Sequence, residues 1–134
     1  MSQTSRLFTA LIRTHHITSR KKLQRVKKAA ALRDIPFVLV RYGGSPGIMY
    51  AEALDQTSLG DWVSAVHDLR YKDFQCVQKP VVAQDVISRT GSGGSAMPSS
   101  PFNEVDSVAD FGAIMERKGL TKWFEIGMGY QSSD

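Results

Sequence analysis

Short apolar runs alternate with amphipathic segments along the first two thirds of the chain. Residues 7–12 (LFTALI) form an apolar run of strand length. The following segment places its apolar side chains at the spacing of one helix face (Leu23, Val26, Ala30). Thr18 or Ser19 offers an N-cap, and Asp34-Ile35-Pro36 ends the pattern. The sequence therefore predicts a strand over 7–12 and a helix over about 19–33.

Two further strands, a helix and a last strand follow. Residues 37–40 (FVLV) and 48–54 (IMYAEAL) read as strands joined by the Gly/Pro turn at 43–47, which predicts a hairpin. Thr57 or Ser58 caps a second helix, whose inner face carries Leu59, Trp62, Val63, Val66 and Leu69. Residues 74–82 (FQCVQKPVV) predict a fourth strand, which Pro80 places near an edge or an end.

The predicted order is β-α-β-β-α-β. This order is typical of an α+β, ferredoxin-like sandwich, in which two helices pack on one face of a four-stranded antiparallel sheet. We assign residues 1–88 to this domain and expect the Gly/Ser/Pro-rich residues 89–104 to form a flexible loop. Residues 105–134 predict an extra helix, ended by Gly119, and an apolar tail. The tail should dock on the domain, because its aromatic side chains would otherwise be exposed.

Composition excludes several classes of protein. With 134 residues, of which 42% are apolar, the chain has enough material for one folded core. No apolar run approaches the roughly 20 residues of a membrane-spanning helix, so we expect no membrane association. The single cysteine, Cys76, excludes an internal disulfide framework and a thiolate-rich zinc site, and it favours the cytosol or nucleus.

Charge is divided unevenly along the chain. Residues 1–44 hold ten Lys and Arg against one acid, Asp34, whereas residues 45–134 hold seven against twelve acids. Such asymmetry indicates an anionic partner for the basic part. The same stretch, rich in Arg and Ser, also has the composition of a mitochondrial transit peptide. We expect a nuclear or cytoplasmic protein, with a mitochondrial location as the alternative.

The most informative segment is 14–22 (THHITSRKK). Arg20, Lys21 and Lys22 fall in the first turn of the predicted helix, where the helix dipole disfavours cations. A phosphate bound at the helix start would reverse this preference. Further cations and a flanking aromatic side chain extend the basic surface (Arg25, Lys27, Lys28, Arg41 and Tyr42). The alternative is a solvated basic face that serves solubility.

His15 and His16 admit three interpretations. Adjacent side chains on a strand point to opposite faces, and no Cys or acid lies nearby in sequence, so we predict neither a metal site nor a cofactor. His16-Ile17-Thr18 matches the His-x-Thr triplet of two-histidine phosphoesterases, but the other histidine, His67, is followed by Asp68-Leu69 and lacks the hydroxyl. The third interpretation is a histidine that helps to bind phosphate or packs at the strand end. We therefore predict no catalytic residue and place a phosphodiesterase third among the functions.

Three motifs together resemble a known family. They are HHI at 15–17 with SRKK at 19–22, GSPGI at 44–48 before a strand containing Glu52, and Trp62 followed by LRYK at 69–72. Across residues 6–82 the chain is similar to the C-terminal domain of the spliceosomal Prp3 family (DUF1115), as a stand-alone relative. The resemblance implies a ferredoxin-like fold and RNA binding, in the splicing member to a small nuclear RNA. It also implies that the family's basic motif is carried here by His15, His16, Arg20, Lys21, Lys22 and Arg25.

Both lines of reasoning predict a non-catalytic RNA-binding module. Its predicted nucleic-acid-binding residues are His15, His16, Arg20, Lys21, Lys22, Arg25, Lys28, Arg41 and Tyr42. Tyr42 or Tyr71 is expected to stack a base. The alternative is a protein-interaction module that docks a partner on the sheet or on the tail at 123–130.

Overall fold

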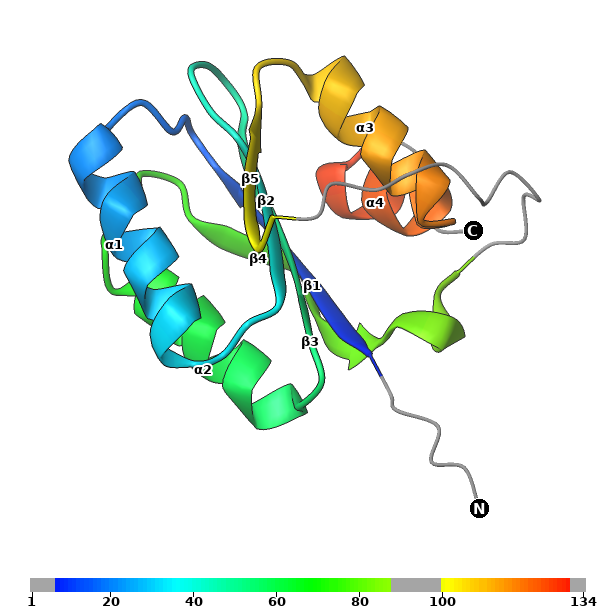
Figure 1. Ribbon diagram of the computed structural model, residues 1–134. Coiled ribbons are helices and arrows are strands. Elements are labelled where there is room, and N and C mark those ends of the chain that lie inside the picture. Colours follow the sequence, from blue (N-terminus) through cyan, green and yellow to red (C-terminus); the bar gives the residue numbers. More distant parts are fainter. Residues whose placement is uncertain (1–6, 88–99, 131–134) are drawn as a thin grey trace.

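Five strands form one mixed sheet that carries helices on both faces (Figure 1). The computed structural model describes residues 7–87 and 100–130. The first part contains β1 (Phe8–Thr14), α1 (Arg20–Leu32), β2 (Phe37–Arg41), β3 (Gly47–Ala53), α2 (Gln56–His67), β4 (Gln75–Val82) and the short 3-10 helix η1 (Ala83–Asp85). The second part contains β5 (Phe102–Val105), α3 (Val108–Arg117) and α4 (Thr121–Met128).

The strands lie in the order β4-β1-β3-β2-β5. β1 pairs antiparallel with both β3 and β4, and β2 pairs antiparallel with β3, whereas β5 runs parallel to β2. The α+β class predicted from the sequence is confirmed, and the arrangement is compatible with a ferredoxin-like one. The sheet differs from the prediction in having a fifth, parallel strand.

Three helices begin at a side-chain cap that the local sequence supplies. The Ser19 hydroxyl accepts a hydrogen bond from the Lys22 N–H at 3.1 Å, and the Asp55 carboxylate accepts one from the Ser58 N–H at 2.9 Å. Ser107 caps α3 in the same way. Each cap satisfies an N–H that has no partner within its helix, which fixes where the helix starts.

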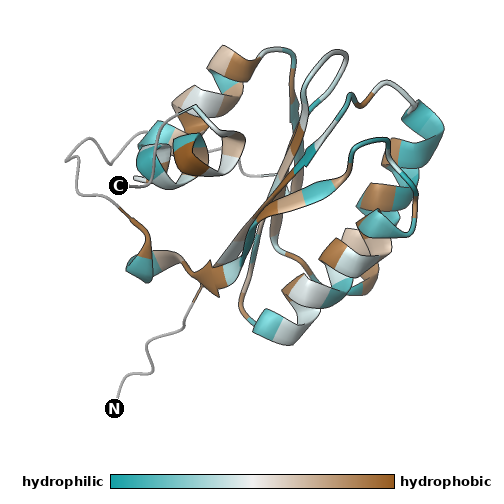
Figure 2. Ribbon diagram, turned by 180° about the vertical axis from the view of Figure 1, so that it is seen from behind, coloured by the Kyte–Doolittle hydropathy of each residue, from teal (hydrophilic) through white to brown (hydrophobic). Residues whose placement is uncertain are grey.

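The sheet separates two apolar cores because successive side chains of β3 point to opposite faces. Met49 and Ala51 belong to the core beneath α1 and α2, whereas Ile48 and Tyr50 belong to the core beneath α3 and α4. Trp62 of α2 is fully buried in the first core. Figure 2 shows both hydrophilic and apolar positions along the two helices on this face of the sheet, as expected for helices with one face on the sheet and the other in solvent.

The C-terminal part differs most from the sequence prediction. Of the loop expected over 89–104, residues 89–99 lie outside the described part, and Phe102–Val105 form β5. The expected helix starts at Val108, and the tail forms a second helix, α4. Both helices cover the face of the sheet opposite α1 and α2 (Figure 1), a face that the sequence prediction did not assign to them. Pairing with β2 stabilises β5, and the four residues FNEV have too little apolar pattern of their own to indicate it.

Candidate nucleic-acid interface

The connection between β1 and α1 is held close to the sheet by Gly47. A Cβ atom at this position would collide with the side chains of Thr14 and Ile17, so only glycine allows the connection to cross here. Ile17 is fully buried below this crossing. The anchored connection leaves His15 and His16 exposed and places Ser19 to cap α1.

Lys21, Arg25 and Lys28 form one exposed ridge on α1, which we call the basic ridge. Their spacing of four and three residues places them on one helix face, opposite the buried Leu23 and Val26. α1 contains no Asp or Glu, so no carboxylate within the helix offsets these charges. The structure thus brings three of the predicted residues together in solvent.

Lys22 faces a different way. Its ammonium group donates a hydrogen bond to the Arg70 carbonyl at 3.3 Å and lies 4.9 Å from the centre of the Tyr71 ring. The Tyr71 side chain is buried, and burial raises the pKa of its hydroxyl to about 12. Tyr71 therefore has no exposed ring face on which a base could stack, contrary to the expectation from sequence.

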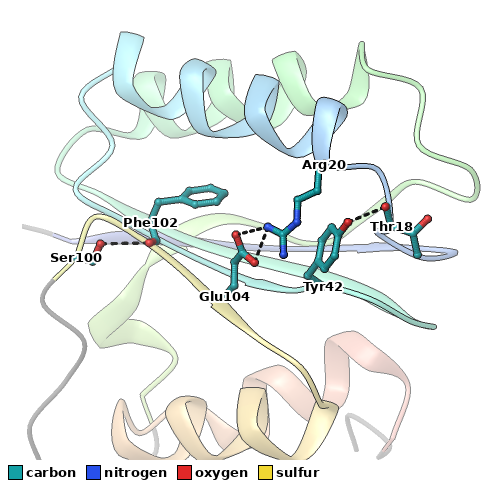
Figure 3. Close-up of polar contacts among 6 residues, drawn as sticks. All are labelled: Thr18, Arg20, Tyr42, Ser100, Phe102 and Glu104. Atoms are coloured by element: carbon teal, nitrogen blue, oxygen red, sulfur yellow. Dashed lines mark hydrogen bonds and ion pairs between the residues drawn. The ribbon is translucent and has the colours of Figure 1, made fainter.

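Arg20 is engaged on both sides (Figure 3). One guanidinium nitrogen, Nη1, donates to both carboxylate oxygens of Glu104 at 2.8 Å, and the guanidinium lies 3.8 Å from the centre of the Tyr42 ring. The Tyr42 hydroxyl in turn donates to the Thr18 carbonyl at 2.7 Å. The hydrogen bonds to Glu104 raise the pKa of Arg20 above its ordinary value. Arg20 and Tyr42 thus lie together as predicted, and the Arg20 guanidinium is paired with a carboxylate while its side chain stays exposed.

Arg41 donates hydrogen bonds to main-chain carbonyls of two connections. Its guanidinium donates from Nε to the Asp106 carbonyl at 3.0 Å and from Nη1 to the Pro46 carbonyl at 3.1 Å. These bonds join the β2–β3 turn to the segment between β5 and α3. Unlike the cations of the basic ridge, Arg41 is half-buried and is hydrogen-bonded to two connections of the fold.

His15 lines a hollow at the end of the sheet, and His16 follows it in the chain. His15 Nδ1 is 3.5 Å from the Asp73 carboxylate, and the His15 and His16 rings are 4.9 Å apart. The hollow has a volume of about 700 Å³ and is lined by Arg13, Thr14, His15, Ser45, Pro46, Asp73, Phe74 and Gln75. His67 does not line it and contacts Phe74 and Asp68 instead. The second histidine of a two-histidine phosphoesterase is thus not brought to His16.

Two contacts were invisible to sequence reasoning. Glu104 and Asp73 lie far along the chain from Arg20 and His15, and neither belongs to a motif that marks it.

The apolar tail, which offered a docking surface in the alternative function, packs on the domain. Trp123, Phe124 and Met128 are at most 5% exposed, so this surface is covered by the domain's own sheet.

The described residues contain neither a cluster that could bind a metal ion nor a helix that could span a membrane. Across 7–87 and 100–130 no three His, Cys, Asp or Glu side chains gather where they could hold a metal ion. Within the same residues no helix has the length and apolar character needed to span a membrane. No protein-family model matches the chain, and no curated protein matches it.

Proposed function

We propose that this chain is a ferredoxin-like, stand-alone relative of the Prp3 C-terminal domain family that binds RNA without catalysis. The observation that carries the proposal is the basic ridge: Lys21, Arg25 and Lys28 stand together in solvent on a helix without acids. The resemblance of the HHI and SRKK motifs supports the same reading and indicates a small nuclear RNA as the candidate partner. A nuclear or cytoplasmic location follows from that partner.

The ridge binds the RNA backbone through charge. Lys21 and Lys28 are seven residues apart, so the ridge spans roughly 10 Å along the helix axis at 1.5 Å per residue. Cations that neutralise phosphates release counterions, which makes affinity fall steeply with salt. The exposed His15 and His16 extend the surface beyond the start of α1.

A charge-matched pair of variants tests the proposal. The triple variant Lys21→Ala, Arg25→Ala, Lys28→Ala removes the ridge. The control variant Lys79→Ala, Arg117→Ala, Lys122→Ala removes the same charge from exposed positions on β4, α3 and α4. Fluorescence anisotropy with a labelled single-stranded RNA at several salt concentrations measures affinity and its salt dependence.

The two variants should behave differently. Loss of the ridge should weaken binding by about tenfold or more and reduce the slope of log K against log salt by about 2, since each phosphate contact with single strands contributes about 0.7. The control should bind nearly as the unmodified protein does. Equal losses in both variants would show a general charge effect and contradict a specific interface. Unchanged binding by the ridge variant would contradict the proposal directly.

A further inference from the structure

The guanidinium of Arg20 is held in one orientation before any ligand arrives. It stacks 3.8 Å from the centre of the Tyr42 ring, and Tyr42 is itself fixed by its hydrogen bond to the Thr18 carbonyl. Figure 3 shows the guanidinium reaching from the start of α1 to Glu104 on β5. An oriented planar cation of this kind suits a phosphate as well as a carboxylate, because both present paired anionic oxygens.

Glu104 occupies the position of such an anion. Both of its carboxylate oxygens lie 2.8 Å from Arg20 Nη1. The pair is accessible, with 58% of the Arg20 side chain and 35% of the Glu104 side chain exposed. Exposed ion pairs contribute little to stability, so an incoming phosphate can replace the carboxylate at small cost.

The backbone that carries Glu104 does not depend on this ion pair. β5 is held to β2 by main-chain hydrogen bonds, with the Val38 N–H donating to the Pro101 carbonyl at 2.8 Å and the Tyr42 N–H donating to the Val105 carbonyl at 3.0 Å. The Glu104 side chain can therefore leave Arg20 while the strand stays in place.

From this geometry we propose that Arg20 and Tyr42 form a phosphate site for RNA that Glu104 occupies in the free protein. The inference rests on the proposed function, and it assigns Glu104 as the residue that sets the affinity. An RNA phosphate displaces the Glu104 carboxylate and takes its two hydrogen bonds from Arg20. This adds the β5 flank of α1, where Lys27 lies 5.8 Å from the Phe102 ring centre, to the basic ridge.

The test compares two variants that each remove one negative charge. Glu104→Gln keeps the size of the side chain but weakens its hold on Arg20. Glu116→Gln is the matched control, because Glu116 is an exposed carboxylate on α3, on the other face of the sheet. Each is titrated with a labelled oligouridylate at several salt concentrations, together with the double variant Arg20→Gln, Glu104→Gln.

The expected result is about threefold to tenfold tighter binding by Glu104→Gln, with a salt slope steeper by about 0.7, as one added phosphate contact requires. Glu116→Gln should bind as the unmodified protein does, and Arg20→Gln should abolish the gain. Equal affinity of Glu104→Gln and the unmodified protein would overturn this inference while the proposed function stands. A gain that persists without Arg20, or that Glu116→Gln reproduces, would also overturn it. Absence of oligouridylate binding by every variant would overturn the proposed function as well.

Discussion

Lys118 and Glu52 form an ion pair between the second helical layer and the centre of the sheet. Lys118 Nζ lies 2.7 Å from Glu52 Oε2, and the two side chains are 14% and 13% exposed. The Tyr50 hydroxyl donates to the same carboxylate oxygen at 2.5 Å, and Lys118 lies 4.2 Å from the centre of the Phe37 ring. The end of α3 is thereby tied to β3 by a charged group that has little contact with water.

Lys118→Met should destabilise the protein by about 3 kcal/mol. The substitution keeps the apolar stem but leaves the Glu52 carboxylate nearly buried without its cation, and an unpaired buried charge is costly. Urea unfolding followed by circular dichroism measures the change in the free energy of unfolding. Lys122→Met on α4 is the control, because Lys122 is exposed, and it should change stability little. Equal stability of Lys118→Met and the unmodified protein would show that the pair contributes nothing.

Two glycine-to-alanine substitutions should have opposite effects. At Gly47 a Cβ collides with Thr14 and Ile17, so Gly47→Ala should cost about 2 kcal/mol through overpacking. At Gly60, inside α2, a Cβ meets open space, and Gly60→Ala should add up to about 1 kcal/mol because alanine favours the helix. Thermal unfolding of both variants checks the pair. A gain of stability in Gly47→Ala would contradict the packing assigned to Gly47, and a loss in Gly60→Ala would contradict the open space at Gly60.

Tyr71→Phe should raise stability at neutral pH by about 1 kcal/mol. The Tyr71 hydroxyl is buried and has no hydrogen-bond partner within the described residues, and such a group pays for its lost hydration. Denaturant unfolding measures the gain. Tyr130→Phe is the control, since Tyr130 is half exposed and should be neutral. A clear loss of stability in Tyr71→Phe would mean that the hydroxyl makes a bond the native state needs.

Stability should fall as pH rises above about 10. Burial raises the pKa of Tyr71 to about 12, and burial together with Glu52 raises the pKa of Tyr50 well above its ordinary value. Both tyrosines keep their proton up to a higher pH in the folded state than in the unfolded chain. Their contribution to the free energy of unfolding is therefore fully present below about pH 10 and is lost as the pH rises from there. Unfolding free energies measured across this range should decline less steeply in Tyr71→Phe. An identical decline would contradict the assignment to Tyr71.

Asp55→Ala should lower the melting temperature at neutral pH, and Asp55→Asn, which keeps the acceptor but not the charge, should lower it less. The Asp55 carboxylate caps α2, and the hydrogen bond from the Ser58 N–H lowers the pKa of this carboxyl. A lowered pKa means that the stabilisation is present above about pH 4 and is lost as pH falls below that value. Calorimetry at neutral and acidic pH should therefore show the two proteins, unmodified and Asp55→Ala, converging in acid. A difference that persists unchanged in acid would contradict the role of the charge.

The local sequence pattern predicted most of the first six strands and helices. The helix expected over 19–33 is Arg20–Leu32, and the strand expected over 37–40 is Phe37–Arg41. β1 extends past the expected residues 7–12, because Arg13 and Thr14 still pair with Ile48 and Gly47 of β3. A polar end of a strand shows no apolar pattern, so only its partner reveals it.

The basic ridge could be predicted from the sequence, but the ion pair of the neighbouring Arg20 could not. The positions of Lys21, Arg25 and Lys28 follow from helical spacing against Leu23 and Val26. The partner of Arg20 lies 84 residues away, and a contact at that distance depends on how β5 joins the sheet.

The sequence by itself determined the first six strands and helices, the Ser19 cap of α1, and the gathering of positive charge on α1, whereas it placed the cap of α2 at Thr57 or Ser58 instead of Asp55. These features depend on side chains only a few residues apart, so their spacing and the capping residues can be identified in the sequence. Tertiary structure alone decided that β5 adds to β2, that Lys118 meets Glu52, and that Glu104 pairs with Arg20. Each of these contacts joins distant residues, and its free energy arises only once the sheet has brought the two partners together.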